Sequence, residues 1–248
     1  MKPLRALFVM SVRQSLPLRR TIALVTIQLA PAGIYVLTTA SRTPQAGLEA
    51  LVEIGATTLF ALTIPVVSIV IGGSTFGVER RDQTLSFIAL RPISRMALAA
   101  AKTSAAITAA FAINLVGAVA LGIAQASRFG SPGVIIGLSI GTFIATAIYV
   151  SVTVPLGFLT DRAVIIGMAY LFLFENGAAL ALPGLATMSP WRIGFASFAA
   201  TIDETLFVTS DLAESLDLSI TKGLVSLLVA LVVGLVLTTQ MLRSRDLA

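Results

Sequence analysis

Several stretches of about 20 predominantly apolar residues, with few or no charges, restrict most strongly what this 248-residue chain can fold into. As α-helices, stretches of that length cross the hydrocarbon layer of a bilayer, whereas the buried strands of soluble proteins are only about four to eight residues long. Only 12% of the residues are charged, whereas soluble domains typically carry about 25%. We therefore expect an all-α integral membrane protein with a single transmembrane domain over residues 1–248.

Six segments have the length and hydropathy expected of a membrane-spanning helix. In chain order they are Thr21–Ala40, Ile54–Phe76, Ala97–Gln125, Gly133–Leu159, Ala163–Leu182 and Thr221–Leu242. Basic residues interleave with apolar ones over residues 2–20, which predicts an N-terminal interfacial helix on the membrane surface. Acidic and apolar residues share the stretch 183–220, which predicts outer interfacial or re-entrant helices before the last span.

The distribution of Lys and Arg predicts which side of the membrane each loop faces. If both termini are cytoplasmic, 13 of the 17 basic residues lie in cytoplasmic segments, as the positive-inside rule requires. This asymmetry accounts for the net charge of +5 without a nucleic-acid partner. The expected location is the cell (plasma) membrane, with the lipid bilayer as a partner of every span.

The residue types that are missing exclude several kinds of chemistry. The chain has no histidine and no cysteine, so disulfides, thiolate zinc sites, His-ligated haem and nucleophile–His catalytic pairs are ruled out. The phosphate-binding pattern G-x-x-x-x-G-K-[ST] is also absent. We therefore expect a non-catalytic chain with no metal and no cofactor of its own.

The loop after the second predicted span carries the most informative local pattern. Leu85 and Ile88 fall on one helical face, and Glu79 and Asp82 stand near its start, where acidic side chains favour the helix dipole. Pro92 ends this short amphipathic helix, and the serine two residues later is placed to cap the next helix. Two interpretations remain open: a helix that docks a soluble partner, or a solvated basic loop.

The same loop resembles the permease subunits of the ABC-2 transporter family. The resemblance lies in a Gly-x-Glu-x-x-x-x-Thr-Leu core, an Arg-Pro-x-Ser-Arg turn and a following lysine, here Gly77, Glu79, Thr84, Leu85, Arg91, Pro92, Ser94, Arg95 and Lys102. The general layout of interfacial helix, six spans and long outer segment is similar over the whole chain.

This resemblance implies that a coupling helix within residues 77–101 docks on a separate cytoplasmic ABC ATPase subunit, which binds ATP and Mg. A second permease copy or a paralogue would complete the transporter. The residues implied in ATPase coupling are Glu79, Arg80, Arg81, Asp82, Thr84, Leu85, Ile88, Arg91 and Arg95.

Polar residues inside the predicted spans are candidates for the translocation path. Glu175 is the only acidic residue within a predicted span, and an intramembrane carboxyl group is a functional candidate by default. Alternatively, the fifth helix breaks near Asn176 and Gly177, and Glu175 is a structural acid at the outer interface. Asn114 is a weaker candidate for the path, and we expect both Asn114 and Gln28 to form hydrogen bonds between helices.

Small residues recur every four positions along the fourth predicted span, at Gly133, Gly137 and Gly141. Such a row lets another helix approach closely. We expect this row to pack within one subunit, with a contact between subunits as the alternative.

The predicted spans agree with what the resemblance implies, which is the membrane-spanning permease subunit of an ABC exporter. Aliphatic, weakly charged spans favour a lipid-like or drug-like cargo. A stand-alone secondary transporter or channel that uses Glu175 is the alternative, although such proteins usually carry more intramembrane charge. An intramembrane hydrolase lacks the residues that it would need, and a scaffold would have no use for a docking loop. The sequence does not identify the cargo or its direction of transport.

Overall fold

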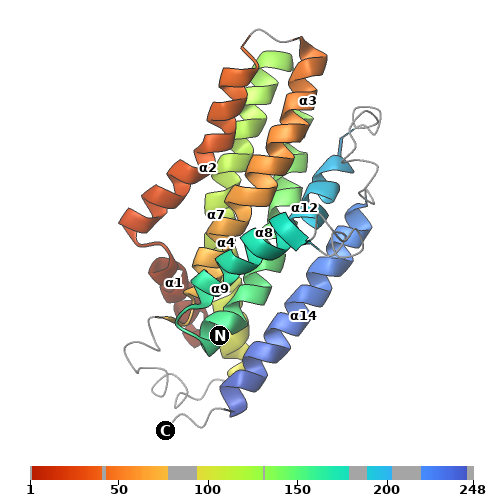
Figure 1. Ribbon diagram of the computed structural model, residues 1–248. Coiled ribbons are helices and arrows are strands. Elements are labelled where there is room, and N and C mark those ends of the chain that lie inside the picture. Colours follow the sequence, from red (N-terminus) through yellow and green to blue (C-terminus); the bar gives the residue numbers. More distant parts are fainter. Residues whose placement is uncertain are drawn as a thin grey trace.

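The computed structural model describes residues 2–40, 43–77, 94–130, 132–178, 189–202 and 219–244. All regular elements within these ranges are helices (Figure 1). In chain order they are α1 (Lys2–Ser15), α2 (Leu18–Thr38), α3 (Pro44–Ile54), η1 (Gly55–Thr63), α4 (Ile64–Gly73), α7 (Arg95–Phe129), α8 (Gly133–Leu159), α9 (Ala163–Ala169), η2 (Tyr170–Ala178), α12 (Pro190–Ala199) and α14 (Ile220–Ser244). The two η elements are π-helical. The prediction of an all-α fold is confirmed for this part of the chain.

Five helical runs within the described residues are long and apolar enough to cross a membrane. They are Leu18–Thr38, Ala46–Gly73, Arg95–Phe129, Gly133–Leu159 and Ile220–Ser244. The predicted count of six spans is therefore only partly confirmed. The difference lies in the segment Ala163–Leu182, because its described apolar helix covers only Ala163–Glu175, which is too short to cross about 30 Å of hydrocarbon unless the bilayer thins around it.

Two spans are longer than the sequence predicted. The second begins at Ala46 rather than Ile54 because α3 runs without a break into η1 and α4. The third, α7, has 35 residues, which is about 52 Å of helix and more than the hydrocarbon core needs. Its start is capped as predicted, since the Ser94 hydroxyl accepts a hydrogen bond from the backbone N–H of Ala97.

Helix α8 lies at the centre of the bundle and packs against α4, α7, α12 and α14. Most of α8 and of the run from Ala46 to Gly73 is buried, whereas α2 and α14 leave most of their apolar side chains exposed. Figure 1 shows α2 and α14 on opposite sides of the molecule. In a bilayer, exposed apolar faces of this kind are available to lipid tails or to other membrane helices.

The glycine row of α8 packs within the chain, as predicted. A Cβ atom on Gly141 would meet the carbonyl oxygen of Gly194 in α12, and one on Gly137 would meet Phe198 and Thr201. Gly133 faces open space. Gly141 therefore lets the backbones of α8 and α12 meet, and Gly137 makes room for the side chains of Phe198 and Thr201.

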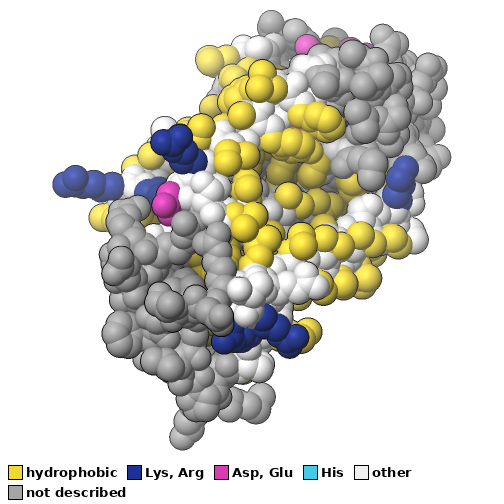
Figure 2. Space-filling model, turned by 60° about the horizontal axis from the view of Figure 1, so that its bottom comes forward, with side chains coloured by type: hydrophobic (Ala, Val, Ile, Leu, Met, Phe, Trp, Pro, Cys, Tyr) yellow, Lys and Arg dark blue, Asp and Glu magenta, His cyan; other side chains and the backbone are white. Residues whose placement is uncertain are grey.

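One end of the bundle holds α1, the first residues of α2 and α7, and the last residues of α4, α8 and α14 (Figure 1). We call it the basic end. Figure 2 turns this end toward the viewer and shows Lys and Arg side chains around a broad hydrophobic surface. The exposed basic residues that the structure describes on elements of this end are Arg5, Arg13, Arg19, Arg162 and Arg243.

Candidate functional site

The loop that the sequence singled out begins and ends at the basic end. Its predicted coupling residues Glu79, Arg80, Arg81, Asp82, Thr84, Leu85, Ile88 and Arg91 lie outside the described residues. The structure does describe both points where this loop joins the bundle. One is the turn at Ser74–Gly77, and the other is Ser94 and Arg95 at the start of α7.

A buried lysine holds the first of these points. Lys102 of α7 is only 1% exposed, and its Nζ donates a hydrogen bond to the carbonyl oxygen of Thr75 at 3.1 Å. The ammonium group also lies 5.0 Å from the centre of the Phe76 ring, a cation–π contact. The Phe76 ring in turn packs edge-on against Phe158 of α8, with 5.3 Å between ring centres. The chain that leaves α4 is thereby joined to α7 and α8.

A second basic side chain holds the other end of the loop. Arg95 donates a hydrogen bond to the carbonyl oxygen of Leu242, in the last turns of α14. A cation at the carboxyl end of a helix satisfies free carbonyl groups and favours the helix dipole. Arg20 of α2 likewise donates to the carbonyl oxygen of Val70 in α4 at 2.9 Å. Three basic side chains therefore connect helices at the basic end through backbone carbonyls.

The second candidate site surrounds Glu175, which is 1% exposed and lies in the π-helix η2. Tyr149 of α8 donates a hydrogen bond to its Oε2 atom. Arg192 of α12 lies close enough to interact electrostatically: burial lowers the pKa of the Arg192 guanidinium, and the Glu175 carboxylate opposes that shift. Arg192 also lies 5.2 Å from the ring centre of Trp191. Glu175 therefore joins α8, η2 and α12.

Part of this cluster has no hydrogen-bond partner among the described residues. The atoms concerned are Glu175 Oε1, Ser189 Oγ, Trp191 Nε1 and Arg192 Nε. Buried polar atoms without partners are rare and are often found at functional sites. π-Helical turns are also often found at functional sites.

Asn114 lies in a separate, fully buried hydrogen-bond network at the middle of the bundle. Its Oδ1 accepts from Gln28 Nε2 at 2.5 Å, and its Nδ2 donates to Ser68 Oγ at 3.1 Å and to Thr146 Oγ1 at 2.8 Å. Thr63 donates to the Gln28 Oε1 atom at 3.1 Å. The network links α2, η1, α4, α7 and α8, so the prediction of interhelical hydrogen bonds for Asn114 and Gln28 is confirmed.

Sequence reasoning missed several members of these sites. Lys102 is part of the loop motif, but we did not predict from the sequence that its side chain is buried. The position of Lys102 inside the predicted span Ala97–Gln125 is the signal that could have shown this. Tyr149 and Arg192 were not recognised as neighbours of Glu175, because no local spacing connects them. Among the described residues, no group of three acidic, histidine or cysteine side chains could hold a metal ion.

In a comparison with protein-family models, residues 16–182 match the family described as ABC-2 family transporter protein. The matched residues are about two thirds of the chain. The matched region runs from the end of α1 beyond η2 and contains the loop, Lys102, Asn114 and Glu175. No curated protein matches the chain.

Proposed function

The chain belongs to the ABC-2 family of transporter permeases, and we propose that it forms the membrane-spanning half of an ATP-driven exporter. In this proposal a separate ABC ATPase subunit binds ATP and Mg and docks on the loop at residues 77–101. A second permease copy or a paralogue supplies the other half. The chain itself is a multi-pass membrane protein, and its role is to form the translocation path and to receive the motion of the ATPase.

The observation that carries this proposal is the attachment of both loop ends to the bundle. Lys102 connects the loop start to α7, and Arg95 connects α7 to the end of α14. A push on the loop would therefore act on α4, α7, α8 and α14 together, because close-packed helices transmit displacement. A merely solvated loop would not need a buried ammonium group at its base.

The charge distribution supports an orientation with the basic end in the cytoplasm. The described residues at that end are rich in arginine, whereas Glu49 and Glu53 are exposed on α3 at the other end. In the orientation that we propose, which follows the positive-inside rule, α1, the loop and the end of α14 lie on the cytoplasmic side of the plasma membrane. A soluble ATPase would reach the loop from that side. The apolar interior favours a lipid-like or drug-like cargo.

The direct test of this function is co-expression with the ABC ATPase subunit, purification of the complex, and measurement of ATP hydrolysis and transport in proteoliposomes. We expect a stoichiometric complex whose transport falls at least about tenfold after Glu79→Lys or Arg81→Glu, since reversed charge pairs at an interface cost several kcal/mol. ATP hydrolysis should persist without transport. Glu49→Lys, at the opposite end, is the matched control and should leave transport unchanged. A folded, inserted chain that binds no ATPase would refute the proposal.

Glu175 is our candidate for the wall of the translocation path, ahead of Asn114, whose amide is already fully engaged with other helices. We expect Glu175→Gln to change substrate-stimulated ATP hydrolysis several-fold, about 1 kcal/mol in binding terms, without lowering the unfolding temperature of the complex. Glutamine keeps the size of the side chain and its acceptor for Tyr149 but removes the charge. Tyr149→Phe removes only that hydrogen bond and keeps the charge. Comparing the two variants therefore separates the effect of the charge from the effect of the hydrogen bond. Unchanged stimulation in both variants would make Glu175 structural.

A further inference from the structure

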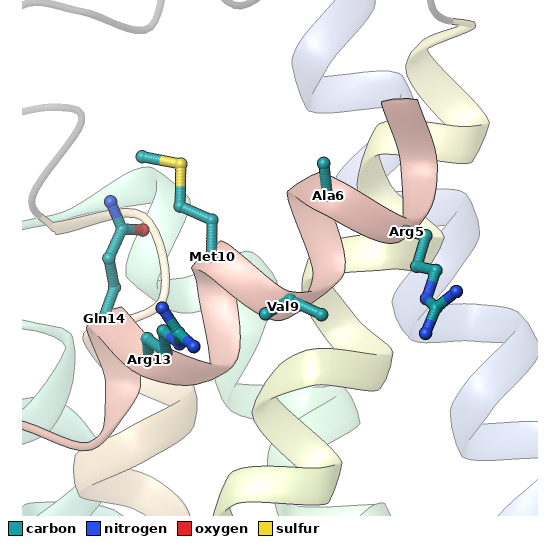
Figure 3. A pocket seen from close by; sticks show the side chains of 6 residues that line it. All are labelled: Arg5, Ala6, Val9, Met10, Arg13 and Gln14. Carbon is teal, nitrogen blue, oxygen red and sulfur yellow. The ribbon is translucent and has the colours of Figure 1, made fainter. Parts of the chain in front are cut away.

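An open groove of about 710 Å³ runs along α1 (Figure 3). Its lining consists of Arg5, Ala6, Val9, Met10, Arg13 and Gln14. Val9 is 42% exposed and Met10 is 57% exposed. These exposed apolar side chains, flanked by two arginines on one helix, have the composition of a helix that lies at a membrane surface.

The groove residues form two parallel rows along the helix. Arg5, Val9 and Arg13 are four positions apart, as are Ala6, Met10 and Gln14, so each row runs along one face. The two guanidinium groups stand two turns apart, about 12 Å along the helix axis, with apolar side chains between them. Helix α1 contains no acidic residue that could pair with either arginine. The opposite side of α1, with Leu7 and the buried Ser11, packs on the bundle.

The position of α1 sets the chemistry that this face meets. Helix α1 ends at Ser15, and the first membrane-spanning helix begins only three residues later at Leu18, which is 75% exposed. The helix therefore lies at the boundary between hydrocarbon and water. At that depth, apolar side chains contact acyl chains while arginine side chains extend toward phosphate groups.

We propose that this face of α1 is a binding site for anionic phospholipid. The phosphate groups bind between Arg5 and Arg13, which can each donate paired hydrogen bonds to phosphate oxygens. The upper acyl chains pack on Val9 and Met10. The two arginines supply the charge and the residues between them the apolar contact, so the site distinguishes anionic from zwitterionic lipid. This inference does not depend on the proposed exporter function.

The test is a lipid titration of the purified full-length protein followed by native mass spectrometry. The probes are phosphatidylglycerol and phosphatidylcholine with identical acyl chains. We expect the wild-type protein to bind phosphatidylglycerol more tightly, and the double variant Arg5→Gln, Arg13→Gln to bind it about tenfold more weakly. The matched control is Arg162→Gln, Arg243→Gln, which removes two exposed charges from the same end of the bundle. Circular dichroism checks that each variant remains helical.

Three results would overturn the proposal. The first is a wild-type protein that shows no preference for phosphatidylglycerol. The second is an equal loss of affinity in the groove variant and in the control variant, which would indicate a general effect of net charge. The third is a groove variant that retains its lipid preference but no longer binds the ATPase subunit, which would identify this face as a protein-docking surface. Loss of lipid preference in the groove variant alone supports the proposal.

Discussion

Replacing Lys102 with methionine is expected to abolish most transport while leaving the chain folded and inserted. Methionine fills nearly the same space as the buried lysine stem, but it cannot donate to the Thr75 carbonyl oxygen or bind the Phe76 ring as a cation. A hydrogen bond from a charged group contributes about 1.5–3 kcal/mol. Without this hydrogen bond, the ratio of attached to detached loop base should fall by about tenfold or more. Transport in proteoliposomes should fall to the same extent.

The readout that separates coupling from folding is ATP hydrolysis measured in the same proteoliposomes. We expect Lys102→Met to retain hydrolysis by the bound ATPase while transport is lost, because the loop still docks but no longer moves the helices together. Arg162→Met, which removes an exposed charge at the same end, should behave like the wild-type protein. Normal transport in Lys102→Met would show that the buried ammonium group has no part in coupling.

Replacing Gly157 with leucine is expected to lower the stability of the bundle sharply. Gly157, near the end of α8, packs directly on the backbone of Gly73 at the end of α4, and a Cβ atom there would meet the Gly73 carbonyl group. Backbone atoms cannot move aside as a flexible side chain can, so α4 and α8 would have to separate. Overpacking costs about 1–3 kcal/mol in free energy of unfolding, and we expect Gly157→Leu to lie at the upper end of that range, which is a large share of the stability of most proteins.

Gly133, on the same helix, provides the matched control. A Cβ atom on Gly133 would meet nothing within 4 Å, so Gly133→Leu adds the same side chain without a clash. Thermal unfolding monitored by size-exclusion chromatography in detergent should show a large loss for Gly157→Leu and little change for Gly133→Leu. Equal unfolding temperatures for both variants would mean that the backbones of α4 and α8 are not in direct contact at Gly73 and Gly157.

The candidate sites were predictable from sequence only in part. Glu175, Asn114 and Lys102 stand out because each is a polar or charged residue within a predicted span, where its desolvation is costly. Their partners could not be predicted, since Tyr149 is 26 residues from Glu175 and Gln28 is 86 residues from Asn114. The coupling role of Glu79, Arg81 and their neighbours stays a prediction.

Hydropathy, segment length and local capping were sufficient to determine that this chain is a helical membrane protein. They also predicted where α7 begins and that the loop at residues 77–101 carries an amphipathic pattern. These properties depend on the thickness of the bilayer and on bonds within one helix, so they can be read along the chain. The tertiary structure alone decided that α3 continues through η1 into α4, and that the described apolar helix after α8 covers Ala163–Glu175. It also decided which helix meets which, because the faces of apolar helices are alike in hydropathy. Their pairing depends on close packing at glycines such as Gly141 and Gly157 and on a few buried hydrogen bonds.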